Sequence, residues 1–290
     1  MAYETTKNFS GNAFVDGVLW GHWGGTSSIS ASKWSSNSLT YSFSGYWNSA
    51  ERAAVENALD IIETVSGLNF TSSGGSTDLT FNQYSGGRDG TLGYAFPPDP
   101  YWGTSNTGNL YFNDSYTDYW NASTLNVGGV GFTLLIHELG HALGLGHPHD
   151  NSYVLPGVSS SNDSGDHGLN QNVYTVMSYN DVGMSLDDGT PISPYALTSY
   201  GYQTLGAFDI AALQHLYGAA SHNTGSNIYV LPDSNTTGTH YTTIWDTGGD
   251  DSIRYGGARN VEIDLRAATL DAADGMLAGG AVSKADGVYG

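Results

Sequence analysis

Apolar residues recur at intervals of three and four along three stretches of the chain, which is the spacing of a helix that buries one face. The first stretch follows Asn48 and reaches Gly67. Asn48 and Glu51 match the capping-box pattern that starts helices, and glycine commonly ends them. The other two stretches cover roughly 129–143 and roughly 206–217. The pattern therefore predicts three main helices.

Short runs of alternating or β-branched and aromatic residues predict strands. Five such runs lie in the first half of the chain, at 39–43, 68–72, 78–84, 91–96 and 109–113. Pro97 and Pro98 end the fourth run, and proline favours an edge position because it cannot donate to a neighbouring strand. A long helix followed by further strands predicts a mixed sheet with one early crossover.

The character of the chain changes after Gly218. Residues 145 to about 204 are rich in Gly, Ser, Asn and Pro, whereas the last seventy residues carry short β-like runs between Gly- and Asp-rich turns. These runs lie at 227–231, 242–246, 252–256 and 261–265. We therefore expect one domain at 1–218 and a second at 219–290. The final "SKADGVYG" has no closing element, as if the chain were cut inside a larger repeat region.

Charge and composition exclude several classes of function. The chain has 28 acidic and 8 basic residues, a net charge of −20, so we expect it to repel nucleic acid and anionic membranes and to attract divalent cations. The absence of cysteine excludes disulfides, a thiolate zinc site and a cysteine nucleophile. No signal peptide is visible at the N-terminus, and no stretch approaches the roughly 18 apolar residues of a membrane span.

The segment "LLIHELGHALGLGHPHD" carries the strongest chemical signal. His137 and His141 are four residues apart and share one helical face, with Glu138 beside them. Gly144 can take the left-handed conformation that ends the helix, which allows His147 to return as a third ligand. Three neutral histidines and a water form an open, catalytic zinc site rather than a closed structural one.

Such a site can hydrolyse an amide. Zinc lowers the pKa of its water from about 15.7 towards 7, and Glu138 would take that proton as general base and return it to the leaving amine. The alternative is a set of solvated histidines at a helix end. A lone H-x-x-x-H can arise by chance, but H-E-x-x-H-x-x-G-x-x-H fixes five positions and favours a zinc site.

The other histidines are not expected to bind the zinc. His149 lies close to the site without an assigned role, and His215 is expected to be a packing residue. The remaining histidines have no ligand spacing: His22, His167, His222 and His240.

The segment from His137 to His147 resembles the metzincin signature of zinc proteases, and Pro148 directly after it is similar to the serralysin branch. A second segment, "YTVMSY", resembles the Met-turn of the same clan. The resemblance implies that Met177 forms an apolar floor under the imidazoles. It also implies that Tyr179 is a fifth zinc ligand that swings away to bind the transition state. Taken alone, the two would be an ordinary core methionine and an exposed tyrosine.

The same resemblance covers the fold and the substrate strand. It implies an α+β, metzincin-like catalytic domain with a mixed, mostly parallel five-stranded sheet and three main helices, followed by the start of a parallel β-roll. "TLGYAFPP" resembles the antiparallel edge strand of the cleft, in which Gly93, Tyr94 and Ala95 would bind an extended peptide through the backbone. The alternative is an edge strand that is merely capped. The helix at 206–217 resembles the one that closes a serralysin catalytic domain.

The tail contains a segment, "IWDTGGDDSIRYGG", that is similar to the start of the calcium-binding β-roll of RTX-type serralysins. An earlier segment, "NTGSN", matches a second contributor, with asparagines where the family usually has arginine and threonine. The part that completes the family's calcium site is expected beyond Gly290. The alternative is a solvated turn. The implied calcium ligands are Asn223, Gly225, Asn227, Asp246, Gly248, Gly249 and Asp251.

The resulting hypothesis is a secreted, extracellular, bacterial zinc endopeptidase that cleaves internal bonds of protein or peptide substrates, with Zn²⁺ for chemistry and Ca²⁺ for the tail. We expect a monomer that is exported through a C-terminal signal outside this sequence. A proteinaceous inhibitor or a propeptide is a further expected partner, and residues 1–35 are either a propeptide remnant or the mature start.

One alternative is a calcium-binding adhesion protein with an inert protease-like domain, which the intact Glu138 disfavours. Another is a metzincin without a β-roll, which Pro148 and residues 244–257 disfavour.

Overall fold

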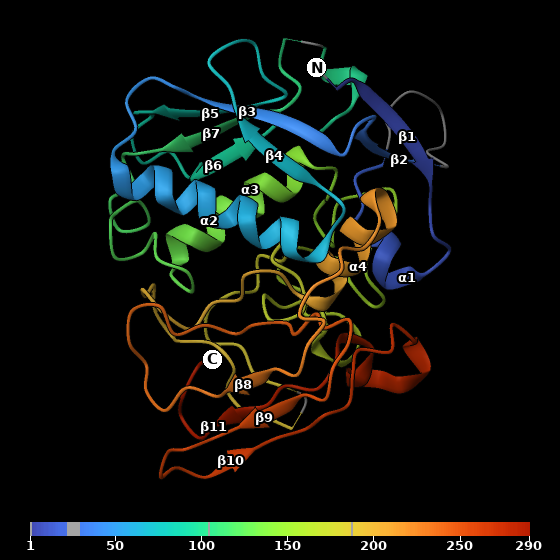
Figure 1. Cartoon of the computed structure of the whole chain (residues 1–290), viewed down its shortest axis with the longest axis vertical. Coiled ribbons are helices and arrows are strands. Elements are labelled where there is room, and N and C mark those ends of the chain that lie inside the picture. Colours follow the sequence, from blue (N-terminus) through green and yellow to red (C-terminus); the bar gives the residue numbers. More distant parts are fainter. Residues whose placement is uncertain (1, 22–29, 104, 187) are drawn as a thin grey trace.

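A five-stranded mixed sheet forms the upper layer of the molecule (Figure 1). The computed structural model describes residues 2–21, 30–103, 105–186 and 188–290. The strand order is β4-β3-β5-β7-β6, in which neighbours pair in parallel except for β6, which runs antiparallel at the edge. This confirms the mostly parallel sheet and the edge position predicted from the two prolines. The strands are β3 (Ser38–Ser44), β4 (Asn69–Ser72), β5 (Leu79–Tyr84), β6 (Gly93–Ala95) and β7 (Asn109–Asn113).

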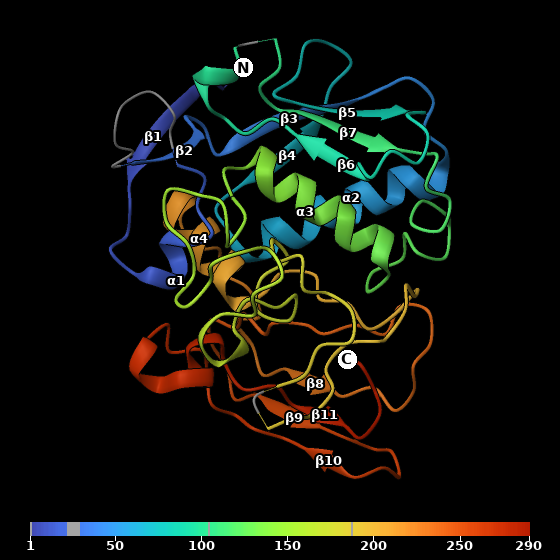
Figure 2. The ribbon, with the colours of Figure 1, turned by 180° about the vertical axis from the view of Figure 1, so that it is seen from behind.

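Two helices, α2 (Ser49–Val65) and α3 (Val130–Ala142), lie side by side beneath the sheet (Figures 1 and 2). α2 is the early crossover, because it connects the parallel neighbours β3 and β4. Its capping box is formed: the Asn48 side chain accepts from the backbone of Glu51, and the Glu51 carboxylate accepts from the backbone of Asn48. The helix ends at Val65 with Ser66 as its cap, two residues before the predicted stop at Gly67.

The third predicted helix is α4 (Ala207–Tyr217). An N-terminal β-hairpin makes hydrogen bonds to both α4 and α3. The hairpin pairs β1 (Glu4–Asn8) with β2 (Ser30–Trp34) in antiparallel register, and α1 (Ala13–Asp16) lies between them in the chain. The indole of Trp34 donates to the carbonyl of Ala142 at 2.9 Å, and Lys33 donates to the carbonyl of Leu216 at 2.7 Å. This part of the chain thus holds the C-terminal ends of both helices together.

An aromatic cluster fills the space between the sheet and the helices. The ring of Trp47 contacts Phe81, Phe112 and Trp120, with centroids about 6 Å apart, and all four side chains are buried. Aromatic contacts of this kind add to the free energy gained from burying their large apolar area. The cluster therefore ties β5 and β7 to the segments that contain Trp47 and Trp120.

The tail after α4 is only sparsely organised into strands. β8 (Ile228–Val230) pairs in parallel with β9 (Ser252–Arg254), and β10 (Val261–Glu262) pairs in antiparallel fashion with β11 (Lys284–Ala285). The strand expected at 242–246 is wrong. The Trp245 indole donates to the carbonyl of Ala220, and Thr247, just after this segment, exchanges hydrogen bonds with His222. The segment is therefore held by a side-chain contact rather than by strand pairing. The division at 219 and the parallel β-roll stay predictions. The 3₁₀ helices are η1 (Pro100–Trp102), η2 (Asp166–Gly168) and the longer, kinked η3 (Ala272–Gly279).

Contacts join the tail to the preceding part of the molecule. Tyr241 forms an isolated bridge with Gln203, and the Asn12 side chain donates to the carbonyl of Leu270 at 2.8 Å. Within the described ranges, no helix has the length and apolar character that a bilayer crossing requires.

Candidate metal centre

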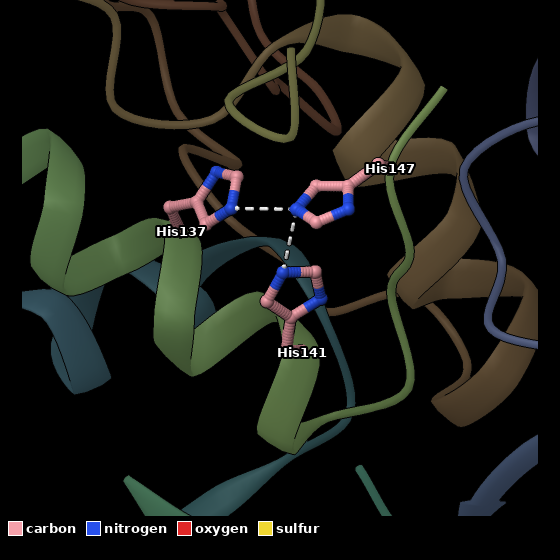
Figure 3. A group of neighbouring side chains, drawn as sticks. All are labelled: His137, His141 and His147. Carbon is pink, nitrogen blue, oxygen red and sulfur yellow. Dashed lines mark hydrogen bonds between the residues drawn. The ribbon is translucent and has the colours of Figure 1, made fainter. Parts of the chain in front are cut away.

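The end of α3 brings two histidines to one face and then reverses the chain. His137 and His141 are one turn apart and buried. Gly144 has φ of +98°, and a Cβ there would lie 2.3 Å from the carbonyl oxygen of Ser32. Only glycine fits this turn without strain, because both the backbone conformation and the close neighbour exclude a side chain. The predicted helix end is confirmed, and the turn places His147 opposite α3 (Figure 3).

The three imidazoles converge through one nitrogen each (Figure 3). The Nε2 atom of His147 lies 3.2 Å from Nε2 of His137 and 3.0 Å from Nε2 of His141. A tetrahedral zinc ion with Zn–N distances of about 2.0–2.1 Å holds its ligand nitrogens about 3.3 Å apart. The predicted ligands are therefore brought together with a spacing close to that of a zinc site.

The opposite nitrogen of each ring has its own hydrogen-bond acceptor. His137 Nδ1 lies 2.8 Å from the carbonyl oxygen of Val176, and His141 Nδ1 lies 3.0 Å from that of Leu145. His147 Nδ1 faces the Asp150 carboxylate, at 3.0 Å from Oδ2. Each acceptor favours a proton on Nδ1, which leaves Nε2 with a free lone pair.

This arrangement fits a bound cation. Three lone pairs that point at one another at about 3 Å repel unless a positive charge lies between them. Protonation is a poor substitute, because burial lowers the pKa of His137 to about 3 and that of His141 well below its usual value, with the neighbouring His147 adding to both shifts. The donor set of three neutral imidazoles is one that zinc prefers. The histidines are thus suited to hold Zn²⁺.

Glu138 lies directly beside the triad. Its side chain is buried, its Oε2 atom has no hydrogen-bond partner among the described residues, and burial raises its pKa to about 8. Strand β6 covers it closely, since a Cβ added at Gly93 would lie 3.2 Å from both Cγ and Oε1 of Glu138. A buried carboxyl oxygen without a partner is uncommon and indicates a ligand or water that the protein is built to receive.

Met177 lies against α3, and its role as a floor under the imidazoles stays a prediction. It is fully buried, and a Cβ added at Gly140 would lie 2.7 Å from its sulfur. The preceding residues are fixed by Asp209 of α4, whose carboxylate accepts from the hydroxyl of Thr175 at 2.6 Å and the backbone of Val176 at 2.7 Å. Because Val176 is the partner of His137, Asp209 connects α4 to the metal centre through this turn.

Tyr179 borders the triad and is 53% exposed. Its ring centroid lies 4.7 Å from that of His147 and 5.8 Å from that of His137. Burial of its inner part, together with the charges of Glu138 and Asp150, raises its pKa to about 12, so its hydroxyl keeps its proton near neutral pH. The tyrosine therefore lies beside two of the predicted ligands, and its role as a zinc ligand stays a prediction.

Sequence reasoning missed three contributors to this centre. Asp150 and Asp209 were given no role, and His149 could not be placed. Asp150 follows the third ligand by three residues, a spacing that can return a carboxylate to the imidazole. Asp209 follows a glycine cap by three residues, which is the acidic position of a capping box. His22, which the sequence gives no ligand spacing, lies outside the described residues.

A comparison with protein-family models decides the classification. The matrixin model matches residues 33–177, half of the chain, and this range contains the three histidines, Glu138 and Met177. The chain belongs to the matrixin family.

Curated relatives of this matrixin are serralysin-type metallopeptidases. A metallopeptidase AprA of Pseudomonas marginalis is 30% identical over 97% of this chain and 58% of its own length. A serralysin of Proteus mirabilis is 29% identical over 79% of this chain and 49% of its own, and serralysin C of Dickeya chrysanthemi is 32% identical over 69% and 40%. The chain spans about half the length of the curated relatives it matches.

The two segments proposed to bind calcium lie next to each other in the tail of the matrixin. The backbone of Asn227 donates to Asp251 Oδ1 at 2.8 Å, and a Cβ at Gly249 would lie 2.3 Å from the carbonyl oxygen of Gly225. The hydroxyl of Tyr229 donates to Asp246. The Oδ1 atom of Asn227 is buried without a hydrogen-bond partner among the described residues. The remaining predicted ligands, Asn223 and Gly248, lie within the same two segments.

Proposed function

We propose that this protein is a zinc-dependent endopeptidase that hydrolyses internal peptide bonds of protein substrates. The observation that carries the proposal is the convergence of three histidine Nε2 atoms beside the buried Glu138 carboxyl, whose Oε2 has no hydrogen-bond partner among the described residues. The family and the serralysin-type relatives support the same activity.

Four residues have roles in the proposed reaction. His137, His141 and His147 would hold Zn²⁺, which when bound supplies a Lewis acid that activates water and polarises a carbonyl. Glu138 would accept the proton of the attacking water and deliver it to the leaving amine nitrogen. Its burial beside β6 keeps bulk water from competing for that proton.

Two further residues complete the proposed catalytic centre. The Tyr179 hydroxyl, which stays protonated near neutral pH, would act as a fifth zinc ligand or donate a hydrogen bond to the oxyanion. Met177 would support the imidazoles from below, where its flexible apolar side chain fills the space under α3.

The edge strand is the proposed substrate platform. β6 runs antiparallel to β7 and, among the described residues, has no strand on its other side, so the backbone of Gly93, Tyr94 and Ala95 can pair with an extended peptide. Since Gly93 lies against Glu138, a peptide paired with β6 would pass directly over the general base.

We further propose that the tail binds structural Ca²⁺ and begins a parallel β-roll. The unpartnered Oδ1 atom of Asn227 and the neighbouring carboxylates of Asp246 and Asp251 supply the oxygen ligands that calcium prefers. Secretion from a bacterial cell, a monomeric state and control by an inhibitor or propeptide follow from the serralysin resemblance and belong to the same proposal.

Casein digestion with and without a zinc chelator tests the activity. We expect cleavage that the chelator abolishes and added zinc restores, and a loss of at least about 100-fold in kcat for Glu138→Gln, since a general base contributes roughly 10²–10⁴-fold. Zinc binding without any cleavage would instead support a binding protein with an inert protease-like domain.

A further inference from the structure

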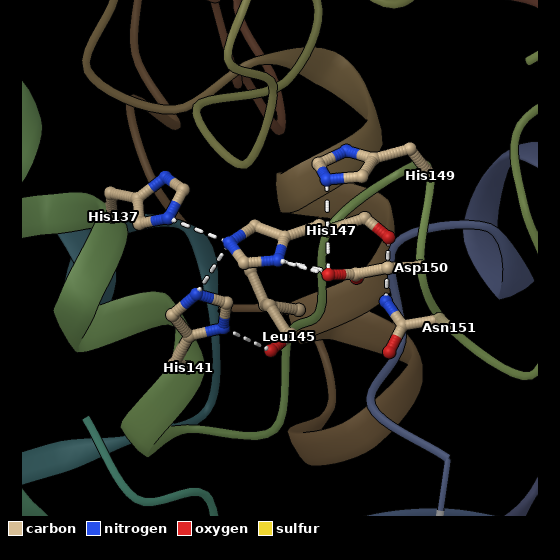
Figure 4. A network of polar contacts seen from close by, with 7 residues as sticks. All are labelled: His137, His141, Leu145, His147, His149, Asp150 and Asn151. Carbon is tan, nitrogen blue, oxygen red and sulfur yellow. Dashed lines mark hydrogen bonds and ion pairs between the residues drawn. The ribbon is translucent and has the colours of Figure 1, made fainter. Parts of the chain in front are cut away.

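The Asp150 carboxylate lies between two imidazoles at the edge of the metal centre (Figure 4). Its Oδ2 atom is 3.0 Å from His147 Nδ1 and 3.8 Å from His149 Nε2, and its Oδ1 atom is 3.2 Å from the same His147 nitrogen. The carboxylate therefore faces the outer nitrogen of the third zinc ligand with both oxygens.

The ring of His149 covers the same ligand from outside. It stacks on His147 with centroids 5.1 Å apart and an interplanar angle of 14°, and it lies 5.0 Å from the ring of Tyr179. Only 10% of the His149 side chain is exposed, whereas that of Asp150 is 52% exposed. The histidine thus takes the place of water on one face of His147 and beside the Asp150 carboxylate.

The third ligand has a different support from the first two. His137 and His141 belong to α3 and bond to neutral backbone carbonyls. His147 lies in a loop after the helix, and its partner is a charged side chain. A ligand outside a regular element depends more on such contacts for its orientation, and a carboxylate also makes the imidazole a stronger donor to the metal.

We propose that Asp150 and His149 are positioning residues that hold His147 as a zinc ligand. Asp150 fixes the proton on Nδ1 and adds a negative charge next to the site, while His149 holds the imidazole plane by stacking. The inference rests on the proposed zinc site, and it assigns a function to His149, which lies near the centre and has no ligand spacing in the sequence.

The test measures zinc affinity rather than proteolysis. The full chain is stripped of metal, and its zinc dissociation constant is determined by competition with a chromophoric chelator. Relative to the unmodified protein, Asp150→Ala should raise the constant roughly 10- to 100-fold, as the loss of an outer partner of a ligating histidine typically does. Asp150→Asn, which keeps an acceptor oxygen but loses the charge, should give a smaller increase. His149→Ala should weaken binding, and His149→Phe, which keeps a stacking ring, should recover most of it.

Glu56→Ala is the matched control, because Glu56 is an exposed residue of α2 and its replacement removes one negative charge away from the site. The visible spectrum of the cobalt(II)-loaded protein gives a second readout: it should change in the Asp150 variants and stay unchanged in Glu56→Ala. Circular dichroism of the metal-free variants verifies folding, and the isosteric Asp150→Asn serves if Asp150→Ala does not fold.

Two results separate the inference from the proposed function. If the unmodified protein binds zinc and folded Asp150 variants bind it within about twofold as tightly, with an unchanged cobalt spectrum, the positioning role is wrong and the zinc site stands. If the unmodified protein binds no zinc, the proposed function itself fails.

Discussion

At the scale of single residues, glycine allows the proposed Met-turn around Met177 to approach α3, the proposed zinc-binding helix. Gly140 lies between His137 and His141 in the chain, and its missing side chain leaves room for the sulfur of Met177. A residue of any other type would push Met177 away from the helix or bend α3. The glycine at this position therefore has a packing function distinct from that of Gly144, which ends the helix.

Gly140→Ala tests this role. The added methyl group would lie 2.7 Å from the Met177 sulfur, so we expect a loss of roughly 1–3 kcal/mol in the free energy of unfolding, the usual cost of overpacking a buried site. Urea unfolding of the metal-free protein measures it. Gly74→Ala is the control, because a Cβ at Gly74 meets no atom within 4 Å. Equal stability of the two variants would contradict the proposed packing.

Single residues also show what the sequence could reveal about the site. His137, Glu138, His141 and His147 were predicted because their spacing along one helix and one turn is a local property of the chain. The partners Asp150 and Asp209 were missed, since the chain offers 28 acidic residues and only the three-dimensional arrangement shows which of them face an imidazole or a buried turn.

At the scale of elements, α4 and the Met-turn are joined by one buried carboxyl group. Asp209 accepts hydrogen bonds from Thr175, Val176 and its own helix cap Gly206. It is completely buried, and this burial raises its pKa to about 6 even though the hydrogen bonds act in the opposite direction.

The raised pKa predicts a pH dependence of stability. Because the folded protein binds the Asp209 proton more tightly than the unfolded chain, its contribution is full below about pH 4 and is lost as the pH rises through about 6. We compare the free energy of unfolding of the unmodified protein with that of Asp209→Asn. The first minus the second should fall by roughly 2–3 kcal/mol as the pH rises from about 4 to about 6. Urea titrations of metal-free protein at several pH values measure the difference. A difference that does not vary with pH would refute the assignment.

The edge strand β6 offers a second prediction at this scale. A methyl group at Gly93 would lie 3.2 Å from the Glu138 carboxyl and 3.1 Å from the carbonyl oxygen of Tyr111, so one neighbour must move. We expect Gly93→Ala to lower kcat for casein or a peptide substrate by about 10-fold or more, because small displacements of a catalytic group are costly. Zinc affinity should change little. Gly75→Ala, in open space, is the control. If kcat does not change, β6 lies farther from the reacting groups than we propose.

Apolar residues that become buried mark most of the elements that were predicted correctly. The three helices and the strands β3, β5 and β7 bury apolar residues. The strands β4 and β6 have no buried residue, and only their aromatic and β-branched side chains indicated them. β1 was missed because its residues, "ETTKN", are polar and at most half-buried, so no apolar alternation marks it. The expected strand at 242–246 failed for the opposite reason: its β-branched and aromatic residues favour a strand, but it pairs with no strand in the part of the chain that the structure describes.

At the scale of the whole molecule, the net charge of −20 and the tail support the calcium proposal. We expect calorimetry to show Ca²⁺ uptake by the full chain, and the melting temperature of the tail to rise with it, because an ion that binds only the folded state stabilises that state. Asp251→Ala should weaken the uptake, whereas Asp274→Ala, outside the two proposed segments, should not. Absence of uptake, or equal uptake by both variants, would contradict the calcium assignment.

The central claim is that His137, His141 and His147 bind the zinc ion of a protease. The most direct measurement is a crystal structure of the zinc-loaded protein with diffraction recorded above and below the zinc absorption edge. The account predicts one strong anomalous peak about 2.0–2.1 Å from the Nε2 atom of each of the three histidines, which is the usual Zn–N distance. No peak at this position in zinc-loaded crystals, or a peak bound by other residues, would contradict it.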